Sequence, residues 1–534
     1  MALEPNLGWD EETDVLIVGL GGAGVCAAIE ASQENARVTV LERFTGGGAT
    51  AISGGVVYAG GGTHIQHEAG VEDDVSNMRA YLAQEAGGVV GEETLRKFCD
   101  ESVESLRWLT DLGLQFEGSL CPQKTSYPND DYFLYYSGNE AAHPYRERAR
   151  PAPRGHRVKG KGLPGRNFFE PLYHHLQQSD ADIRLHCRAL ELIQDEEGRV
   201  IGLSFSEIPP GRWAKLHGQI ESLATKFALF TPSVSRVLRS WGSRIESRQG
   251  RTMKIRVKKG VILCTGGFIN NRKMMEEHAP EYLAGLPIGT TGCSGDGIQM
   301  GQALGARTQH MDNISGWLFL NPPHAFIHGI LIDREGKRFV NEALYGAVTG
   351  GALMEEAGGS GFLIIDEELR TRARSQLGGG QTQLFQTLPG LLNLLFNCKK
   401  AKNVEALARL CGCELESIKR TLKEYNDATQ AGEVDAFRKE ERQVLSPPYY
   451  VVPCSPGQWT WPLMMLTLGG LCVEEESGAV KNEAGEIIPG LYAAGRAAVG
   501  ICSQNYVSGL SIADCVYSGR RAGRMAACQD KETR

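Results

Sequence analysis

The pattern of apolar and polar positions near the N-terminus predicts a strand, a helix and a second strand. Residues 15–18 form an apolar run short enough for a buried parallel strand, and residues 38–41 form another. A helix that begins near Ala23 lies between the two runs. The second run ends in Glu42, and a glycine-rich loop follows at residues 46–55. This order predicts an α/β fold that opens with a parallel strand–helix–strand unit.

Helical, irregular and extended stretches follow in turn. Residues 72–115 carry apolar side chains at roughly helical spacing, so helices are predicted there. Residues 120–165 are irregular and rich in Tyr, Pro, Gly and Arg, and a loop of this length is typical of a functional segment. Short strands are predicted at 182–205, 253–257 and 261–264.

A second domain is predicted over residues 275–440. Strands near 328–333 and 361–366 precede helices near 403–426, which is a different order from that of the N-terminal unit. The chain then closes with two glycine-containing apolar segments, at 468–472 and 490–495, and a helix that begins near Gly509.

The segment 210–250 is locally basic in an acidic protein, and it contains two Trp and two Phe. One interpretation is an amphipathic element that rests on a membrane surface or covers an apolar entrance. The other interpretation is a helical hairpin that packs on the body of the protein or forms a subunit interface. Basic residues interleaved with Trp fit both, so both stay open.

Composition excludes some classes of partner. The formal net charge of −8 gives no reason to expect nucleic acid. The acidic N-terminus has no secretory signal, and no apolar run of ~18 residues predicts a membrane span. The 14 cysteines are scattered, and Cys411-Gly412-Cys413 is too tight for the usual zinc spacing, so buried thiols and no metal are expected. A cytoplasmic protein is expected, and the basic segment leaves open a peripheral position on the inner face of the membrane.

The run Gly19-Leu20-Gly21-Gly22-Ala23-Gly24 between the first strand and its helix predicts a dinucleotide site. Glycines there allow a tight turn, close approach of the backbone to a pyrophosphate and close packing of helix on strand. The helix N-terminus favours phosphate charge. Glu42, at the end of the second strand, is placed to accept hydrogen bonds from a ribose. The fold class is therefore Rossmann-like.

Further phrases identify a family. Gly485–Gly495 closes in Ala-Ala-Gly, and the chain resembles the fumarate reductase and succinate dehydrogenase flavoproteins, whose FAD site has two parts. The resemblance implies a discontinuous FAD-binding domain, 1–274 and 445–534, with an inserted α+β catalytic (capping) domain, 275–444. The other matching phrases are Ser53-Gly54-Gly55, Cys264-Thr265-Gly266-Gly267, Gly295-Asp296-Gly297, Gly336-Lys337-Arg338-Phe339-Val340-Asn341-Glu342 and Leu468-Gly469-Gly470.

The chain also departs from that family. An Arg proton donor is expected shortly after the phrase that ends in Glu342, but Tyr345 stands there and no dicarboxylate clamp can be assembled. The succinate dehydrogenases tether FAD through a His in the first glycine-rich loop, and residues 45–55 contain no His. We therefore expect FAD to be bound non-covalently.

Tyr345 and Tyr506-Val507-Ser508-Gly509 resemble the 3-ketosteroid Δ4-(5α)-dehydrogenases. The 1-dehydrogenases instead carry a Tyr-Pro-Gly-Pro-Gly-like phrase near the C-terminus, which this chain lacks. The resemblance implies a FAD-dependent 3-oxosteroid 4-dehydrogenase with a 3-ketosteroid substrate and an unknown electron acceptor. The alternatives are a 3-ketosteroid 1-dehydrogenase and a fumarate- or urocanate-type alkene reductase.

Four residues carry the expected chemistry. The Tyr506 hydroxyl and the Gly509 N–H would hold the 3-keto oxygen as it gains charge. Ser508 would take a proton from the adjacent carbon through a relay to Tyr345, whose pKa the site is expected to lower. Ser508 as a simple helix cap is the alternative. Tyr127, Tyr132, Tyr135 and Tyr136 form an aromatic loop that lines an apolar steroid slot or packs as a lid.

The FAD-binding residues expected from the motif and the resemblance are Gly19, Gly21, Gly22, Ala23, Gly24, Glu42, Arg43, Gly47, Gly48, Ala49, Thr50, Ser53, Gly54, Gly55, Ala189, Thr265, Gly266, Gly267, Asp296, Gly495, Arg496, Gly509, Leu510, Ser511 and Ile512.

Overall fold

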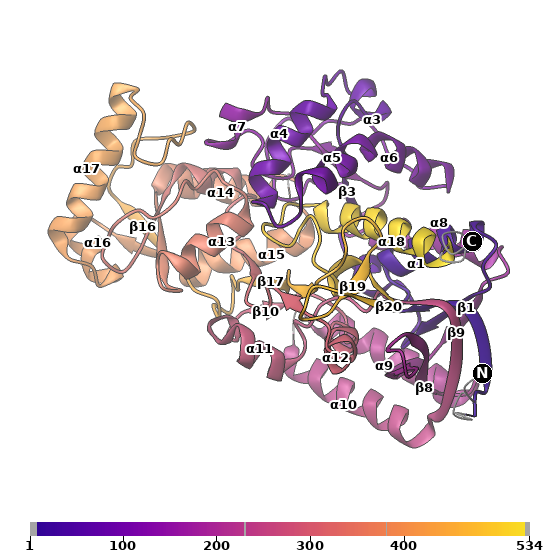
Figure 1. Cartoon of the computed structure of the whole chain (residues 1–534). Helices are drawn as coiled ribbons and strands as arrows, with labels where there is room; N and C mark the ends of the chain where they lie inside the picture. The colour runs from indigo at the N-terminus through magenta and orange to yellow at the C-terminus, as the bar shows by residue number, and fades with distance from the viewer. Residues whose placement is uncertain (1–7, 229–230, 381, 529–534) are drawn as a thin grey trace.

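The computed structural model describes residues 8–228, 231–380 and 382–528. Leu229 and Phe230 of the basic segment lie outside these ranges. Figure 1 shows a central sheet with helices above and below it, and an outlying group of helices and strands built by residues of the 330–454 region. No helix in the described ranges combines the length and apolarity needed to cross a bilayer.

The central sheet has five parallel strands in the order β20-β9-β1-β2-β6, which come from both ends of the chain. Its apolar strand runs have both faces covered, as parallel sheets require. The antiparallel strand β19 extends one edge, and the β7–β8 hairpin pairs with β9. The strands are β1 (Glu11–Val18), β2 (Val38–Glu42), β6 (Asp182–Leu185), β7 (Cys187–Gln194), β8 (Val200–Glu207), β9 (Arg251–Leu263), β19 (Ala479–Lys481) and β20 (Ile487–Ala493).

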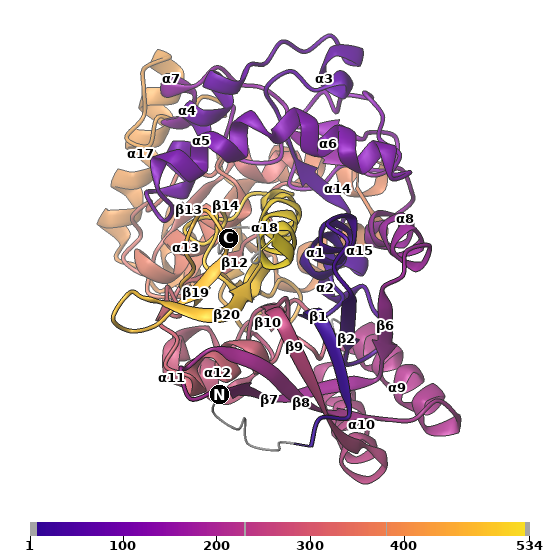
Figure 2. The ribbon, with the colours of Figure 1, turned by 45° about the vertical axis from the view of Figure 1, so that its right-hand side comes forward.

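Helices α1 (Gly22–Gln33) and α18 (Leu510–Cys528) lie side by side on one face of this sheet (Figure 2). Their close approach requires glycine in α18, because a Cβ on Gly519 or Gly523 would lie only 2.4 or 2.3 Å from the backbone of α1. The last helix is thus packed on the first, and the two halves of the predicted domain form one body.

An N-terminal layer covers the upper side of that pair in Figure 1. It contains the predicted helical region 72–115 and the irregular region 120–165, and residues 56–58 form a small sheet with two short strands of the irregular region. Its elements are β3 (Val56–Tyr58), α3 (His64–Glu68), α4 (Val75–Ala86), α5 (Glu92–Asp100), α6 (Ser102–Asp111), β4 (Leu134–Tyr135), α7 (Tyr145–Arg148) and β5 (Gly155–Arg157), and α2 (Gly48–Ala51) and α8 (Gly165–Gln177) link it to the sheet.

The capping region is built on an antiparallel sheet of order β13-β14-β16-β15. Strand β16 pairs with both β14 and β15. The limits of the capping domain, 275–444, stay a prediction. The elements are β13 (Ile330–Ile332), α13 (Gly346–Glu355), β14 (Gly361–Asp366), α14 (Glu367–Gly378), α15 (Leu384–Leu392), the π-helical turn η3 (Asn393–Asn397), β15 (Lys399–Ala401), α16 (Val404–Cys411), α17 (Leu415–Ala431) and β16 (Tyr449–Cys454).

Short elements join the capping region to the central sheet, and the segment 210–250 is a helical hairpin of α9 and α10. The hairpin interpretation of that segment is confirmed. These elements are α9 (Arg212–Ala228), α10 (Pro232–Gln249), α11 (Arg272–His278), η1 (Pro280–Tyr282), β10 (Leu286–Pro287), α12 (Asp296–Ala303), β11 (Thr308–Gln309), β12 (Ile314–Trp317), η2 (His324–His328), β17 (Met464–Thr467), β18 (Gly470–Leu471) and η4 (Gly495–Ala497).

Candidate active site

The turn between β1 and α1 has the shape that a pyrophosphate needs. Gly19 lies in the left-handed region with φ +99°, and a Cβ on Gly24 would lie 1.9 Å from the Gly19 carbonyl oxygen. A Cβ on Gly21 would meet nothing within 4 Å. Gly24 therefore secures the packing of helix on strand, whereas Gly21 keeps open the space into which phosphate oxygens fit.

Glu42 is buried at the end of β2, and its carboxylate closes the same turn. It accepts hydrogen bonds from the Leu20 N–H at 2.7 Å and the Phe44 N–H at 2.8 Å. Burial raises the pKa of Glu42, and the two backbone donors oppose that rise. Its position agrees with a ribose-binding role, which stays a prediction.

The second part of the cradle comes from β9 and the C-terminal segment. The Thr265 hydroxyl is buried without a hydrogen-bond partner. Gly495 lies at φ +60°, its N–H donates to the Ser518 hydroxyl at 2.9 Å, and a Cβ there would approach the Cβ of Ala23 to 2.9 Å. A buried hydroxyl without a partner is costly unless a ligand satisfies it. The residues present thus fit a dinucleotide.

The glycine-rich loop after β2 faces the α1 turn. The Thr50 hydroxyl accepts a hydrogen bond from the Gly22 N–H at 3.1 Å, and Gly47 adopts φ +90°. Tyr127 lies against Gly54, because a Cβ on Gly54 would lie 2.3 Å from its ring. The remaining predicted members of this loop are Gly48 and Ala49, which start α2, and Ser53 and Gly55, which follow it.

Arg43 and Asp296 meet, but in an ion cluster that the sequence did not predict. Arg43 donates to both Glu246 carboxylate oxygens, at 2.7 and 2.8 Å, and its third contact is Asp296 at 3.3 Å. Arg188 lies 3.4 Å from Asp296. Glu246 belongs to α10, so the hairpin packs against the segment that follows Glu42.

The other predicted FAD residues lie on several further segments. Arg496 contacts the Cys293 sulfur at 3.9 Å, and Gly266 adopts φ +75°. Ala189 lies in β7, and Gly267 precedes Phe268, whose N–H binds the Thr467 hydroxyl. Leu510, Ser511 and Ile512 form the first turn of α18.

Replacing Gly21 with alanine tests the cradle. Because the added Cβ meets nothing within 4 Å and Gly21 has φ −92°, the apoprotein should keep its unfolding midpoint. FAD affinity should fall at least ~10-fold, since the methyl group occupies the space of the phosphate. Titration of apoprotein with FAD, followed by flavin fluorescence, measures this. Gly378→Ala, where the new Cβ also meets open space, is the control, and equal affinities in the two variants would contradict the assignment.

The four predicted catalytic residues lie together. The Tyr345 and Tyr506 rings are 6.5 Å apart between centroids, and the Gly509 backbone hydrogen-bonds to the Tyr506 phenol. Ser508 contacts the Tyr345 hydroxyl. Tyr345 is the residue before α13, and the other three precede α18, so the loop ends of two domains form this cluster.

Gly509 is restricted to glycine by its backbone. Its φ is +92°, and a Cβ would lie 2.8 Å from the Tyr58 nitrogen. The Gly509 carbonyl also accepts from the Tyr58 N–H at 3.1 Å and from the Ala513 N–H at 3.0 Å. Gly509 directly precedes α18, where the helix N-terminus favours a developing negative charge.

The expected lowering of the Tyr345 pKa is wrong for the chain itself. Complete burial raises the pKa of Tyr345 well above its usual value, and the neighbouring Tyr506 and Tyr135 add to the rise. The hydrogen bond from Ser508 opposes it only in part. A phenol taken out of water loses more hydration as an anion than one hydroxyl returns. Tyr345 is therefore a protonated group at neutral pH.

Sequence reasoning missed the closest partner of Ser508. The hydroxyls of Tyr135 and Ser508 lie 2.8 Å apart, and Tyr135 is fully buried in β4. The sequence placed Tyr135 only in an aromatic lining. A separation of 373 residues leaves no local signal for this pair. Two tyrosines, Tyr135 and Tyr345, thus meet one serine.

A buried polar network that the sequence did not predict supports Tyr345 from behind. The Asn139 side-chain oxygen accepts from the Tyr345 N–H at 2.6 Å, and its amide donates to Glu85 at 2.8 Å. The Tyr81 hydroxyl donates to the same Glu85 oxygen at 2.6 Å. Burial raises the pKa of Glu85 to about 7. Lys124, whose amino group donates to the Ala343 carbonyl, is partly buried, and desolvation lowers its pKa to about 8.

Glu85 makes stability depend on pH. Its pKa rises from 4.5 when unfolded to about 7 when folded, so its stabilising protonated form is fully present below 4.5 and is lost as pH rises through 7. Relative to Glu85→Gln, the parent should lose about 3 kcal/mol of unfolding free energy between pH 4.5 and 8. Calorimetric unfolding midpoints of both proteins across this range measure the loss. Glu92→Gln, at an exposed site in α5, is the control, and a constant gap between parent and Glu85→Gln would contradict the assignment.

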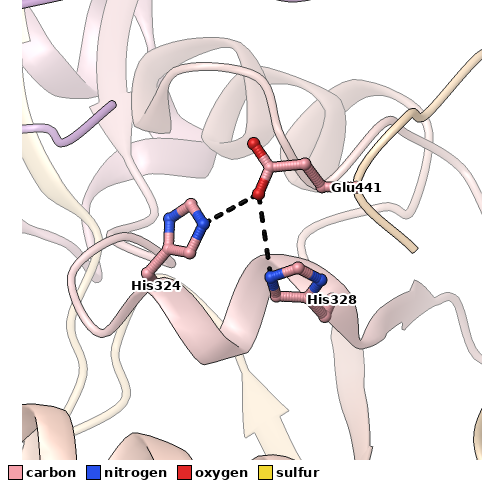
Figure 3. Close-up of side chains that lie close together, drawn as sticks. All are labelled: His324, His328 and Glu441. Atoms are coloured by element: carbon pink, nitrogen blue, oxygen red, sulfur yellow. Dashed lines mark hydrogen bonds and ion pairs between the residues drawn. The ribbon is translucent and has the colours of Figure 1, made fainter. Parts of the chain in front are cut away.

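His324, His328 and Glu441 form a cluster whose ligand-type atoms lie within 4.8 Å of one another (Figure 3). His324 Nε2 lies 2.8 Å from Glu441. The Asn321 amide nitrogen contacts both the Lys124 carbonyl, at 2.6 Å, and His324 Nδ1, at 3.3 Å. This amide orientation makes Nδ1 an acceptor and leaves the proton on Nε2, which donates to Glu441. His328 Nε2 lies 3.7 Å from the same Glu441 carboxylate, so the three side chains already pair with one another.

The comparison with known protein families agrees with this cradle. The FAD binding domain family matches residues 14–511. The chain belongs to this family. FAD is its cofactor, and the predicted fold class, a discontinuous Rossmann-like domain with an inserted capping domain, is confirmed.

Two relatives cover almost the whole chain. The 3-oxo-5-alpha-steroid 4-dehydrogenase of Comamonas testosteroni is 36% identical over 91% of this chain and 93% of its own length. The crystal structure of the 3-ketosteroid-delta4-(5alpha)-dehydrogenase of Rhodococcus jostii RHA1, in complex with 4-androstene-3,17-dione, matches with a TM-score of 0.82 and 31% identity over 98% of each chain. The predicted resemblance to these dehydrogenases is confirmed.

More distant relatives share the fold. The 3-ketosteroid delta1-dehydrogenase of Sterolibacterium denitrificans matches with a TM-score of 0.64 at 18% identity, over 97% of this chain and 100% of that one. The cytochrome-linked fumarate reductase of Shewanella frigidimarina is 23% identical over 98% of this chain and 78% of its own length. The FAD-binding architecture is thus common to steroid and fumarate enzymes.

Proposed function

We propose that this chain is a FAD-dependent 3-oxosteroid 4-dehydrogenase, which introduces the double bond between carbons 4 and 5 of 5α-3-ketosteroids. The meeting of Tyr345, Tyr506, Ser508 and Gly509 at one place carries the proposal. It gives an acid–base pair and an oxygen-binding pair within one apolar surrounding. The names of the two relatives that match over nine tenths of the chain support the same activity.

The chain's own residues would act on the proton and the carbonyl. The Tyr506 hydroxyl and the Gly509 N–H hold the 3-keto oxygen and stabilise it as the carbon beside it loses a proton. The ionised form of Tyr345 accepts the Ser508 hydroxyl proton as the Ser508 oxygen receives the proton from the steroid carbon. Tyr135 donates to or accepts from Ser508 and fixes the direction of its hydroxyl. When bound, FAD supplies the acceptor of the hydride that leaves carbon 5.

Residues from three segments exclude water around this step. Tyr127 covers Gly54 of the FAD loop and hydrogen-bonds to the Gly54 and Gly162 carbonyls at 2.9 Å each. Trp317 packs on the Tyr506 ring at 4.8 Å between centroids. A dry site strengthens each hydrogen bond to the developing oxyanion.

Anaerobic mixing of the holoenzyme with a 5α-3-ketosteroid tests the activity. We expect the flavin absorbance to bleach while a conjugated enone appears in the ultraviolet. A product with the double bond at carbons 1 and 2 would favour the 1-dehydrogenase, and a flavin that reoxidises only with fumarate or urocanate would favour the alkene reductase. The first result would discard the 4,5-dehydrogenation but keep a steroid substrate, whereas the second would discard the steroid site described above.

Membrane contact is a separate part of the proposal, and the identity of the electron acceptor stays open. The outer face of the α9–α10 hairpin exposes apolar side chains, each 38–51% accessible, among basic residues, so it is the alternative surface for peripheral contact with a bilayer. The inner face is occupied, since α10 supplies Glu246 to Arg43. The exposed apolar residues are Leu216, Leu223, Phe227, Val234, Val237 and Trp241.

A further inference from the structure

The capping region exposes a surface that is more apolar than the hairpin. Helix α15 and the turn η3 contain no Asp or Glu, and several of their large side chains face solvent. Together with one Trp from a neighbouring loop, these side chains are 51–81% exposed. We call this surface the apolar knob, and its residues are Leu384, Leu388, Leu395, Phe396 and Trp459.

Two aromatic side chains of the apolar knob pack together near a buried polar group. The Phe396 and Trp459 rings lie 6.4 Å apart between centroids. Beneath them, the buried Asn393 accepts hydrogen bonds from Thr460 and Asn397, at 3.1 Å each. Leucine and phenylalanine outside with asparagine inside is the reverse of a water-soluble helix face. The fold therefore holds these side chains outward.

Three lysines follow the apolar knob in the sequence. Residues 379–403 contain three Lys and no Asp or Glu, and Lys399, Lys400 and Lys402 are exposed directly after η3. An apolar patch flanked by lysines complements the acyl chains and anionic headgroups of a bilayer. Trp459 at the edge of the patch is the residue type that prefers the boundary between headgroups and acyl chains.

The inner side of the apolar knob leads to the candidate active site. Phe385 of α15 packs on Tyr127, with ring centroids 6.0 Å apart, and Tyr127 meets Tyr135 edge-on at 6.5 Å. Tyr135 in turn hydrogen-bonds to Ser508. Gln383, the residue before α15, ties this end to Asp130 at 2.7 Å. An unbroken aromatic path thus connects the exposed leucines to the catalytic serine.

We propose that the apolar knob docks on an anionic lipid bilayer, and that an apolar substrate passes from the lipid to the site beneath Phe385. The docking follows from the apolar and basic chemistry of residues 384–402 alone. The passage of substrate rests on the proposed function. The α9–α10 hairpin, which also exposes apolar side chains among basic residues, serves as the matched control.

Flotation of the holoenzyme with phosphatidylcholine vesicles, with and without phosphatidylglycerol, tests the docking. We expect binding that strengthens with phosphatidylglycerol and weakens in high salt. The double variant Leu395→Asp/Phe396→Asp should partition onto the vesicles ~100-fold less than the parent. Two apolar side chains that insert into the bilayer are replaced by charged ones. Val237→Asp/Trp241→Asp, on the hairpin, should bind as the parent does. If the double variant loses FAD, Trp459→Ala tests the docking instead, because it only truncates an exposed ring. Its vesicle partitioning should fall ~10-fold.

Three results would overturn the docking. The parent fails to float, the knob variants float as well as the parent, or gel filtration shows a dimer that the knob variants convert to monomer while vesicle binding is unchanged. The last result would assign the surface to a second copy of the chain.

The passage of substrate has its own readout. With steroid delivered in vesicles, the flavin of the knob variants should be reduced ~10-fold more slowly than that of the parent. With water-dispersed steroid, the flavin of the variants should be reduced at the parent's rate. Equal slowing under both conditions would overturn the passage. If no steroid reduces the parent's flavin although the vesicles bind, the proposed function fails while the docking stands.

Discussion

Replacing Tyr345 with phenylalanine is expected to lower the rate of flavin reduction by a 5α-3-ketosteroid ~10³-fold, the range of a lost acid–base group. Tyr345 is completely buried beside Ser508 and Tyr506, and the change removes one hydroxyl while the ring packing stays. Stopped-flow absorbance of the holoenzyme under anaerobic conditions measures the rate. FAD content and the unfolding midpoint should match the parent.

The pH profile separates a relay from a structural role. Burial raises the pKa of Tyr345 well above its usual value, so the ionised phenol is scarce at neutral pH. If Tyr345 accepts the proton, the parent rate rises ~10-fold per pH unit on the alkaline side until that pKa is reached. Tyr345→Phe should show a flat profile over the same range. Near-full turnover in this variant would remove Tyr345 from the mechanism.

Two further variants identify the tyrosine that accepts the proton. Tyr135→Phe should keep the pH slope of the parent and lose only ~10-fold in rate, since Tyr135 orients Ser508. Tyr449→Phe removes the hydroxyl of a tyrosine buried in the capping sheet, and it should leave the rate unchanged. If Tyr135→Phe rather than Tyr345→Phe abolishes the slope, Tyr135 is the acceptor and the predicted relay is wrong.

The FAD half of the fold was accessible from the sequence because its constraints are local. Gly24 must be glycine where α1 meets the Gly19 carbonyl, and Gly495 adopts a left-handed conformation. Such positions leave a visible glycine in the chain. The strand run 15–18 also matches the observed β1, since a buried parallel strand needs continuous apolar residues.

The catalytic cluster needed more than local pattern. A tyrosine before α13 and a Tyr-Val-Ser-Gly phrase before α18 gain meaning only from the resemblance to known dehydrogenases. Tyr135 and Asn139 support them from the irregular region, where no periodicity marks their role. The pKa of Tyr345 was mispredicted because its sign depends on burial, which spacing along the chain does not reveal.

The two exposed apolar surfaces show the same limit. The Trp and basic residues of segment 210–250 allow a membrane-facing interpretation of the whole segment. In the structure, however, one face of the hairpin is bound to Arg43 through Glu246. The run 384–396 has the composition of a core segment, but in the structure its leucines are exposed. An apolar segment is predicted to be covered by another surface, but its sequence does not say whether that surface is protein or lipid.

Replacing Tyr506 with phenylalanine should lower kcat ~10²- to 10³-fold, the range of a lost oxyanion donor. The phenol is partly exposed beside the Gly509 backbone, and desolvation raises its pKa, so it remains a donor at neutral pH. The ring should keep its packing against Trp317 and Tyr345, because only the hydroxyl is removed. Anaerobic flavin reduction again measures the rate.

The pH dependence distinguishes this loss from that of Tyr345. Tyr506→Phe removes a hydrogen bond to the carbonyl oxygen but leaves Ser508 and Tyr345 in contact, so the slow rate should still rise with pH. Affinity for a steroid with a phenolic first ring, whose anion resembles the enolate, should fall in parallel with kcat, because both report the oxygen-binding pair. A flat profile, or unchanged affinity for the phenolic steroid, would show that Tyr506 acts in proton transfer or packing, and Gly509 would then hold the oxygen without it.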